Sequence, residues 1–219
     1  MSKLVWDQTN EKRYETGVEQ VALFPQVKGA YSIGVAWNGI SALNLTPSGG
    51  EPTALYANNR KYLTLMSVEE LGGTIEAYMY PEEWAACDGS AEAAPGVYVG
   101  QQSRSIFGLA AKTLIGNDSE LNKFGYKLHL VYGALASPSE QSYSTVNDSP
   151  DVNPMSWEFT TTPVALEGFS STSHICIDST KVDAEKLKAL EAIIYGSDDV
   201  EARLPMPDEV VSLLKGAEG

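Results

Sequence analysis

Few residues in this chain are of the kinds with which enzymes and metalloproteins usually work. Among 219 residues it has two histidines, His129 and His174, and two cysteines, Cys87 and Cys176. Histidine is the usual acid–base group near neutral pH, and two cysteines so far apart form neither a disulfide framework nor a metal site. We expect two free, buried thiols and two histidines that lie within strands.

Recognisable catalytic motifs are also missing. The chain contains no G-x-S-x-G nucleophile elbow, no Walker or dinucleotide-binding motif and no EF-hand loop. His174 and Cys176 would share one face of a strand, but a histidine with ordinary hydrogen-bond partners is the simpler interpretation. Glu82 and Glu83 are adjacent, so on a helix they diverge and cannot flank one glycosidic bond. We therefore expect no enzymatic activity, no cofactor and no metal.

Positive charge is scarce. Lys and Arg number 15 against 29 Asp and Glu, which gives a net charge of −14. Affinity for nucleic acid comes mainly from cations that neutralise phosphates, so this balance opposes tight binding of DNA or RNA. The simplest interpretation of the charge is solubility. A second interpretation is a surface past which a polyanion can move without being held.

Long apolar runs are missing too. The first 14 residues, MSKLVWDQTNEKRY, show no apolar core or small-residue cleavage site of a secretory signal. No apolar run approaches the roughly 18 residues of a membrane helix, so we expect no membrane segment. Hydrophobic residues nevertheless make up 43% of the chain, which is ample for a packed core.

What the sequence does contain is a series of strand-like patterns. They lie at residues 20–24, 33–37, 40–45, 62–67, 73–80, 97–102, 104–114, 125–136, 155–166 and 173–179. Asn38-Gly39 between two such runs predicts a hairpin, since a type I′ turn needs positive φ at both central residues. The alternative there is one bent strand with a glycine bulge. We expect the runs at 97–102 and 104–114 to pair with each other.

Helical patterns are few. The clearest covers residues 183–195, with Asp183 as N-cap and Gly196 after its end. Shorter helices are predicted at 81–87 and 207–215. Many strands with one substantial helix predict a mainly β fold, a β-sandwich or barrel-like domain with a flanking helix. Its expected divisions are an N-terminal arm at 1–18, the β-domain at 19–196, and a C-terminal arm with a short helix at 197–219.

Two polar segments are longer than the usual connection between strands, residues 46–61 and 137–154. Loops of more than about 12–15 residues are uncommon in compact domains unless they are functional. The first contains no nucleophile, metal-ligand set or phosphate-binding motif. Such a loop on a β-scaffold suggests contact with other copies of the same chain.

Several blocks resemble one protein family, the major tail protein (tail tube protein) of long-tailed, siphophage-type bacteriophages, and together they span nearly the whole chain. They are WNGISALNLTPSGGEPTALYANNRKYLTL, GGTIEAYMYPEEWAACDGS, GYKLHLVYGALASPSEQSYSTVNDSPDVNPMSWEFTTTPV, DSTKVDAEKLKALEAIIYG and ARLPMPDEV. The resemblance implies a β-sandwich-like fold with a flanking helix and no enzymatic activity. It also implies hexameric rings that stack into the hollow tail tube.

The resemblance further implies partners and a location. The partners would be other copies of the chain, the tail terminator, the tail tip and the tape measure protein. Genomic DNA would pass through a negatively charged lumen without tight binding on its way into the host. The protein would be made and assembled in the host bacterial cytoplasm and would end in the virion tail.

Residue roles follow from combining this resemblance with the patterns above. For the loop at 46–61, we expect ring-to-ring stacking, with its tip at Ser48, Gly49, Gly50 and Glu51 and Tyr56 as an anchor. The N-terminal arm and residues 196–207 are secondary candidates for the same contact.

The strand carboxylates Glu76 and Glu158 are expected to line the lumen, because a wall of like charge offers DNA no place to bind. The alternative function is a carbohydrate-binding or adhesive β-sandwich of a phage tail, for which Trp84 and Tyr80 would supply exposed aromatic rings. A hydrolase has little support, because no catalytic triad is evident.

Overall fold

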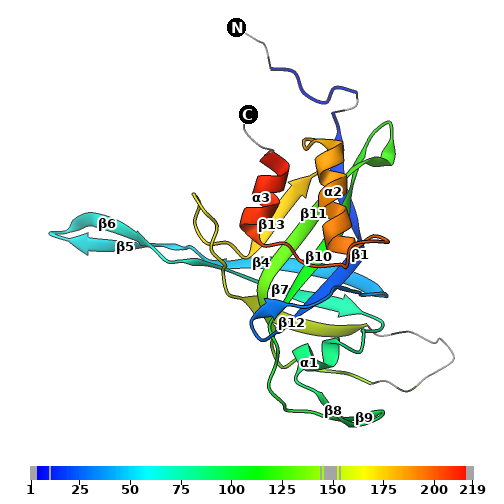
Figure 1. Cartoon of the computed structure of the whole chain (residues 1–219). Coiled ribbons are helices and arrows are strands. Elements are labelled where there is room, and N and C mark those ends of the chain that lie inside the picture. Colours follow the sequence, from blue (N-terminus) through cyan, green and yellow to red (C-terminus); the bar gives the residue numbers. More distant parts are fainter. Residues whose placement is uncertain (1–3, 10, 144, 146–151, 153, 216–219) are drawn as a thin grey trace.

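The computed structural model describes residues 4–9, 11–143, 145, 152 and 154–215, and its fold is mainly β, as predicted (Figure 1). The strands are β1 (Arg13–Val27), β2 (Ala30–Tyr31), β3 (Val35–Ala36), β4 (Ile40–Gly49), β5 (Pro52–Ala57), β6 (Arg60–Met66), β7 (Glu69–Ala77), β8 (Ala91–Ala94), β9 (Val97–Val99), β10 (Phe107–Asn117), β11 (Leu121–Ala136), β12 (Met155–Thr161) and β13 (His174–Asp178). The helices are α1 (Trp84–Asp88), α2 (Ala184–Tyr195) and α3 (Pro207–Lys215). None of these helices is long and apolar enough to cross a membrane.

One antiparallel sheet organises the molecule. Its strands follow the order β2-β1-β10-β11-β12-β7-β4, with β13 on β11 and β3 on β1. The chain leaves β3 beside β1 and enters β4 at the other end of the sheet, and the Trp37 N–H donates to the Val21 carbonyl oxygen at 2.8 Å on the way. The two ends of the sheet are therefore joined, and the sheet curls around an interior.

Aromatic side chains fill that interior. Trp84, at the start of α1, is fully buried, and its ring centroid lies 4.6 Å from Trp37, 5.0 Å from Phe107 and 5.6 Å from Trp157. Tilted and edge-to-face pairs of this kind contribute about 0.5–1.5 kcal/mol each beyond their area burial. Because the four rings come from different parts of the chain, their packing holds opposite walls of the sheet together.

The helices cover the outer face of the same strands. In β1, Leu23 belongs to the interior cluster, while its neighbour Phe24 packs in the outer one. The stripe of α2 that includes Leu190 packs on this outer face, and α3 lies beside it (Figure 1). The helix α2 begins as predicted, because the Asp183 carboxylate accepts the N–H groups of residues 185 and 186. One sheet thus separates two hydrophobic clusters.

Two predicted strand pairings are wrong. Asn38-Gly39 does not close a hairpin, since β3 pairs with β1 and β4 pairs with β7. The alternative of a bent segment is closer to the structure, with Gly39 at φ +76° and a bulge after Ile40. Likewise β9 pairs with β8, and β10 pairs with β1 and β11. Local turn signals do not choose partners, because pairing depends on which faces are buried across the whole sheet.

The predicted arms and loops also need correction. Residues 13–18 are no arm, because β1 begins at Arg13 and pairs with β10. The segment before α3 is fastened to the domain, since the buried Tyr132 hydroxyl donates to the Pro205 carbonyl oxygen and Leu204 is buried. Residues 137–143 lie outside helices and strands, whereas most of the remaining predicted loop up to 154 lies outside the described residues. Both cysteines are free; Cys87 is buried, but Cys176 is exposed.

The interior aromatic cluster leads to a stability prediction. Replacing Trp84 by Ala removes the ring that contacts the other three, so we expect a loss of about 3–5 kcal/mol in the free energy of unfolding. Chemical denaturation measures this loss. Trp6→Ala is the matched control, because Trp6 is 75% exposed and its loss should change stability by less than about 0.5 kcal/mol. Equal effects of the two substitutions would contradict the role of the cluster.

Candidate functional site

The segment predicted as a loop, residues 46–61, instead comprises the end of β4, all of β5 and the start of β6. Strands β4 and β7 pair as far as Gly49 opposite Glu69, and β5 and β6 then pair up to Ala57 opposite Arg60. Asn58 and Asn59 turn the chain at φ +51° and +59°, as a type I′ turn requires. We call residues 50–68 the arm. It projects far from the body of the molecule (Figure 1).

The predicted loop tip lies at the base of the arm instead. Ser48 and Gly49 end β4, and Gly50 and Glu51 separate that strand from β5. Gly49 and Gly50 have φ values of +77° and +70°, and a Cβ on Gly49 would lie 2.5 Å from the Val68 carbonyl oxygen. Position 49, where the β4–β7 ladder ends and the β5–β6 ladder follows, therefore has no room for a side chain. The true tip is the turn at residues 58–59.

The arm is apolar on both faces, which is unusual for a structure surrounded by water. Tyr56 and Met66 project on one face and are 72% and 73% exposed. Leu55, Leu63 and Leu65 occupy the other face and are also exposed. A lone two-stranded hairpin is only marginally stable in water, and an exposed apolar surface of this kind is typical of an interaction site. The position of Tyr56 on the arm agrees with its predicted use as an anchor, although its role is a prediction.

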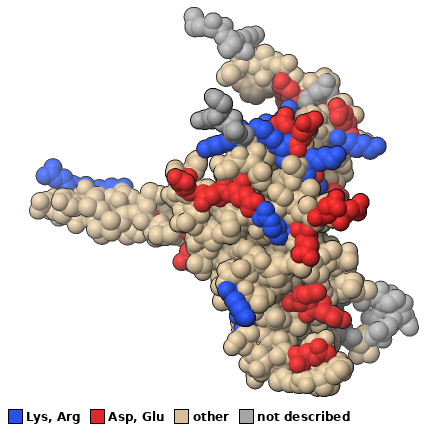
Figure 2. Space-filling model, in the orientation of Figure 1, with Lys and Arg blue, Asp and Glu red and all other residues tan. Residues whose placement is uncertain are grey.

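The arm also differs from the body in charge. Its tip carries Arg60 and Lys61, and its strands β5 and β6 contain no Asp or Glu. Figure 2 shows basic side chains at the far end of the arm and many acidic ones over the body. The molecule therefore extends a small basic and apolar tip away from an acidic surface.

The two predicted lumen residues, Glu76 and Glu158, lie on one sheet face. Glu76 is opposite Ser156 and Glu158 is opposite Thr74, while Ile75 and other alternate residues point into the core. Neither carboxylate is buried. Strands β4, β7 and β12 contain no Lys or Arg. This outer face is therefore acidic and otherwise uncharged within these three strands.

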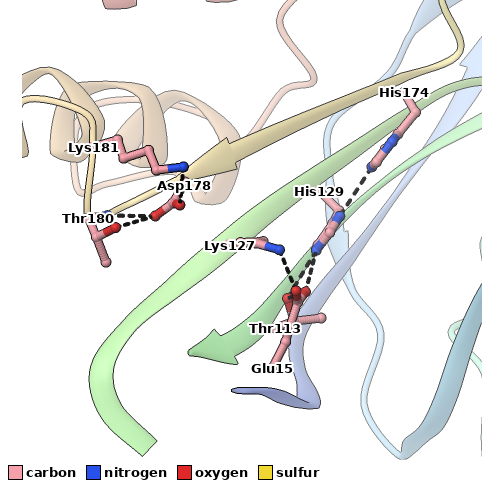
Figure 3. Close-up of polar contacts among 8 residues, drawn as sticks. All are labelled: Glu15, Thr113, Lys127, His129, His174, Asp178, Thr180 and Lys181. Atoms are coloured by element: carbon pink, nitrogen blue, oxygen red, sulfur yellow. Dashed lines mark hydrogen bonds and ion pairs between the residues drawn. The ribbon is translucent and has the colours of Figure 1, made fainter. Parts of the chain in front are cut away.

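A polar cluster occupies the face of β11 opposite the helices (Figure 3). The Glu15 carboxylate pairs with Lys127 and accepts the Thr113 hydroxyl at 2.5 Å. Thr113 Oγ1 lies 3.0 Å from His129 Nε2, and His129 Nδ1 lies 3.1 Å from His174 Nε2. Their imidazole planes differ by only 4°. These contacts link β1, β10, β11 and β13 across the sheet.

Titration in this cluster favours neutral imidazoles at pH 7. Burial, and then the neighbouring His129, lower the pKa of His174 to about 4. Burial also lowers the pKa of His129, although Glu15 opposes that shift. Burial raises the pKa of the Glu15 carboxyl group. Hydrogen bonds from Lys127 and Thr113 lower it by more, so the pKa lies below the ordinary value. One imidazole N–H can then donate to the lone pair of the other.

This cluster offers little chemistry. Cys176 lies opposite His129 in the ladder, but partial desolvation raises the pKa of its thiol, which leaves little thiolate near neutral pH. Within the described ranges, no three His, Cys, Asp or Glu side chains are arranged to hold a metal ion. We interpret the cluster as a set of cross-strand contacts, in agreement with the expectation that both histidines have ordinary partners. The sequence predicted that His129 and His174 lie on strands. It did not predict that they contact each other, because that contact depends on the pairing of β11 with β13.

The aromatic residues of the alternative, carbohydrate-binding interpretation are only partly available. Trp84 is fully buried in the core and cannot contact a sugar. Tyr80 is exposed, with its ring edge-to-face on Trp157 at 5.7 Å. Tyr98, which is exposed nearby, lies within the strand predicted at 97–102, but the sequence did not identify it as an exposed aromatic residue of this site.

Comparison with known proteins adds no relative. Neither a scan against models of protein families nor a search of curated proteins found a match for this chain.

The histidine pair predicts a pH dependence of stability. The pKa of His174 falls from an ordinary 6.5 to about 4 on folding, so between these values the unfolded chain binds a proton that the folded chain does not. Stability is therefore lost as pH falls from about 6.5 to about 4. We expect His174→Gln to make the melting temperature fall less steeply over this window than in the wild type. Parallel pH profiles for the two proteins would contradict the shifted pKa.

Proposed function

We propose that this chain is a structural subunit that polymerises through its arm as stacked hexameric rings to form the tail tube of a long-tailed bacteriophage. The observation that supports this most is the arm itself, with exposed apolar side chains on both faces and a basic tip. Burying one large apolar side chain stabilises an interface by about 1.5–3 kcal/mol. Several such side chains on one projection favour contact with another protein surface.

Self-association fits the shape of the chain. The arm extends to one side (Figure 1), so a contact between its tip and another part of a second copy joins two different surfaces. Heterologous contacts of this kind close into rings or continue into filaments. A tube of stacked rings requires both kinds of assembly, closed rings and a repeat along the tube axis. Contacts with a tail terminator, a tail tip and a tape measure protein belong to the same proposal, as does its place in the virion tail after assembly in the host cytoplasm.

The proposed tube is a conduit for genomic DNA, and the acidic face of β4, β7 and β12 supports that use. Phosphate contacts with Lys and Arg hold nucleic acid, and each adds to the affinity. This face has Glu76 and Glu158 but no cation in its three strands. We assign it to the lumen, where DNA would pass without binding. The carbohydrate-binding alternative is weaker, because buried Trp84 cannot contribute to an exposed aromatic site.

The arm provides the direct test of assembly. Replacing residues 51–67 with a short turn would leave the β4–β7 ladder closed and the body intact, so we expect a folded monomer with nearly the melting temperature of the wild type. Negative-stain microscopy and sedimentation at high protein concentration should show rings or tubes for the wild type and none for the variant. Tubes from the armless protein would refute the role of the arm, and a wild type that stays monomeric would count against the proposed function.

The proposed lumen has its own test. Glu76→Lys with Glu158→Lys should still permit tubes, because both side chains lie outside the core. Tubes with these lysines should retain DNA at low salt and release it as salt rises, while wild-type tubes should not bind it. Filter binding of short duplex DNA to purified tubes measures this difference. The matched control is Glu120→Lys with Glu167→Lys, which adds equal charge at exposed positions outside β4, β7 and β12. Equal binding by both variants would remove the assignment of the lumen face.

A further inference from the structure

A second projecting hairpin marks the end of the molecule that carries α1. All residues of β8 and β9 are exposed, among them Val97 and Tyr98. Tyr80, just before α1, is exposed as well. The carboxylates Glu82 and Glu92 come from the same region. We call these five residues the acidic end patch; they combine apolar and aromatic surface with negative charge.

The carboxylates of this patch act on its aromatic side chains. Glu92 contributes most to raising the pKa of the Tyr98 phenol, followed by desolvation and then by Glu82 and Tyr80. The groups that shift this pKa include no cation. Arg104, the cation of this region, acts on Asp88 instead. The patch therefore presents carboxylates beside exposed tyrosine.

The arm tip has the complementary chemistry. Arg60 and Lys61 are the only charged residues of β5 and β6, and Tyr56 and Tyr62 beside them are each 72% exposed. Basic and aromatic side chains on the tip match acidic and aromatic side chains on the patch, and such complementarity sets register and partner choice. Aromatic residues and arginine are also the groups most enriched at the energetic centres of interfaces.

The arm tip cannot contact the acidic end patch of its own molecule. In Figure 1 the arm extends to the left of the body, whereas β8, β9 and α1 lie at the bottom. The partner of the tip must therefore belong to another molecule. We propose that the arm tip of one copy docks on the acidic end patch of a second copy, an inference that rests on the proposed function and names the surface that receives the arm.

This arrangement leaves neither hairpin exposed. Each copy gives one tip and receives another, so the contact is heterologous and can repeat without limit or close on itself. It also makes assembly sensitive to salt, since the charges at an exposed rim are screened over about 8–10 Å at physiological ionic strength.

A charge-exchange experiment on the full chain tests the proposal. Arg60→Glu with Lys61→Glu, or Glu82→Lys with Glu92→Lys, places like charges in contact and should each lower the assembled fraction at least about tenfold. Combining all four substitutions restores opposite charges and should recover assembly to within about twofold of the wild type. Sedimentation velocity at fixed protein and salt concentration measures the assembled fraction.

The control is Glu120→Lys with Glu167→Lys, which changes net charge by the same amount as the patch variant at exposed positions outside every proposed contact. Loss in both reversed variants, recovery in the combination and normal assembly of the control support the proposal. If only the tip variant fails, or if the combination does not recover, another surface receives the arm; the inference is then wrong while the proposed function stands. A wild type that never associates would overturn both.

Discussion

The contact of Trp84 with Trp37, Phe107 and Trp157 is the interaction on which the rest of the structure depends. These side chains come from α1, from the link between β3 and β4, from β10 and from β12, so a single cluster joins distant parts of the sheet. A sheet that curls around such a cluster needs no second layer to fill its interior. Its outer faces are then free for other uses.

Those outer faces are used in different ways. One outer face is covered by α2 and α3, and another is the acidic surface of β4, β7 and β12, while the inner side of β11 carries the polar contacts around His129 and His174. The strands β4 and β7 are also continued outward into the arm. The exposed surfaces therefore depend on the same curled sheet, and the proposed contacts all involve elements that the core holds in place.

Local signals were enough to predict some of this arrangement. The N-cap and apolar stripe of α2 lie within a few residues of each other, and the predicted strands that contain Glu76 and Glu158 are strands in the structure, with both carboxylates outside the core. Partner choice was not predictable in this way, as β3 and β4 show, because it depends on contacts between distant strands. The arm was predicted only in part, as a strand at 62–67, for another reason: with apolar residues on both faces and Asn58-Asn59 within a polar run, its first strand lacks the alternation that identifies a strand.

The glycines at the base of the arm have a mechanical consequence. At Gly50 and at residues 67–68, no ladder pairing joins the body to the arm, and Gly49 and Gly50 tolerate backbone angles that other residues avoid. The arm is thus joined to the body without ladder hydrogen bonds at this point, so its angle to the body can change more readily than the angle between paired strands. A polymer connected through such joints would bend by small changes of angle between rigid subunits, so a long fibre could curve without any subunit being deformed.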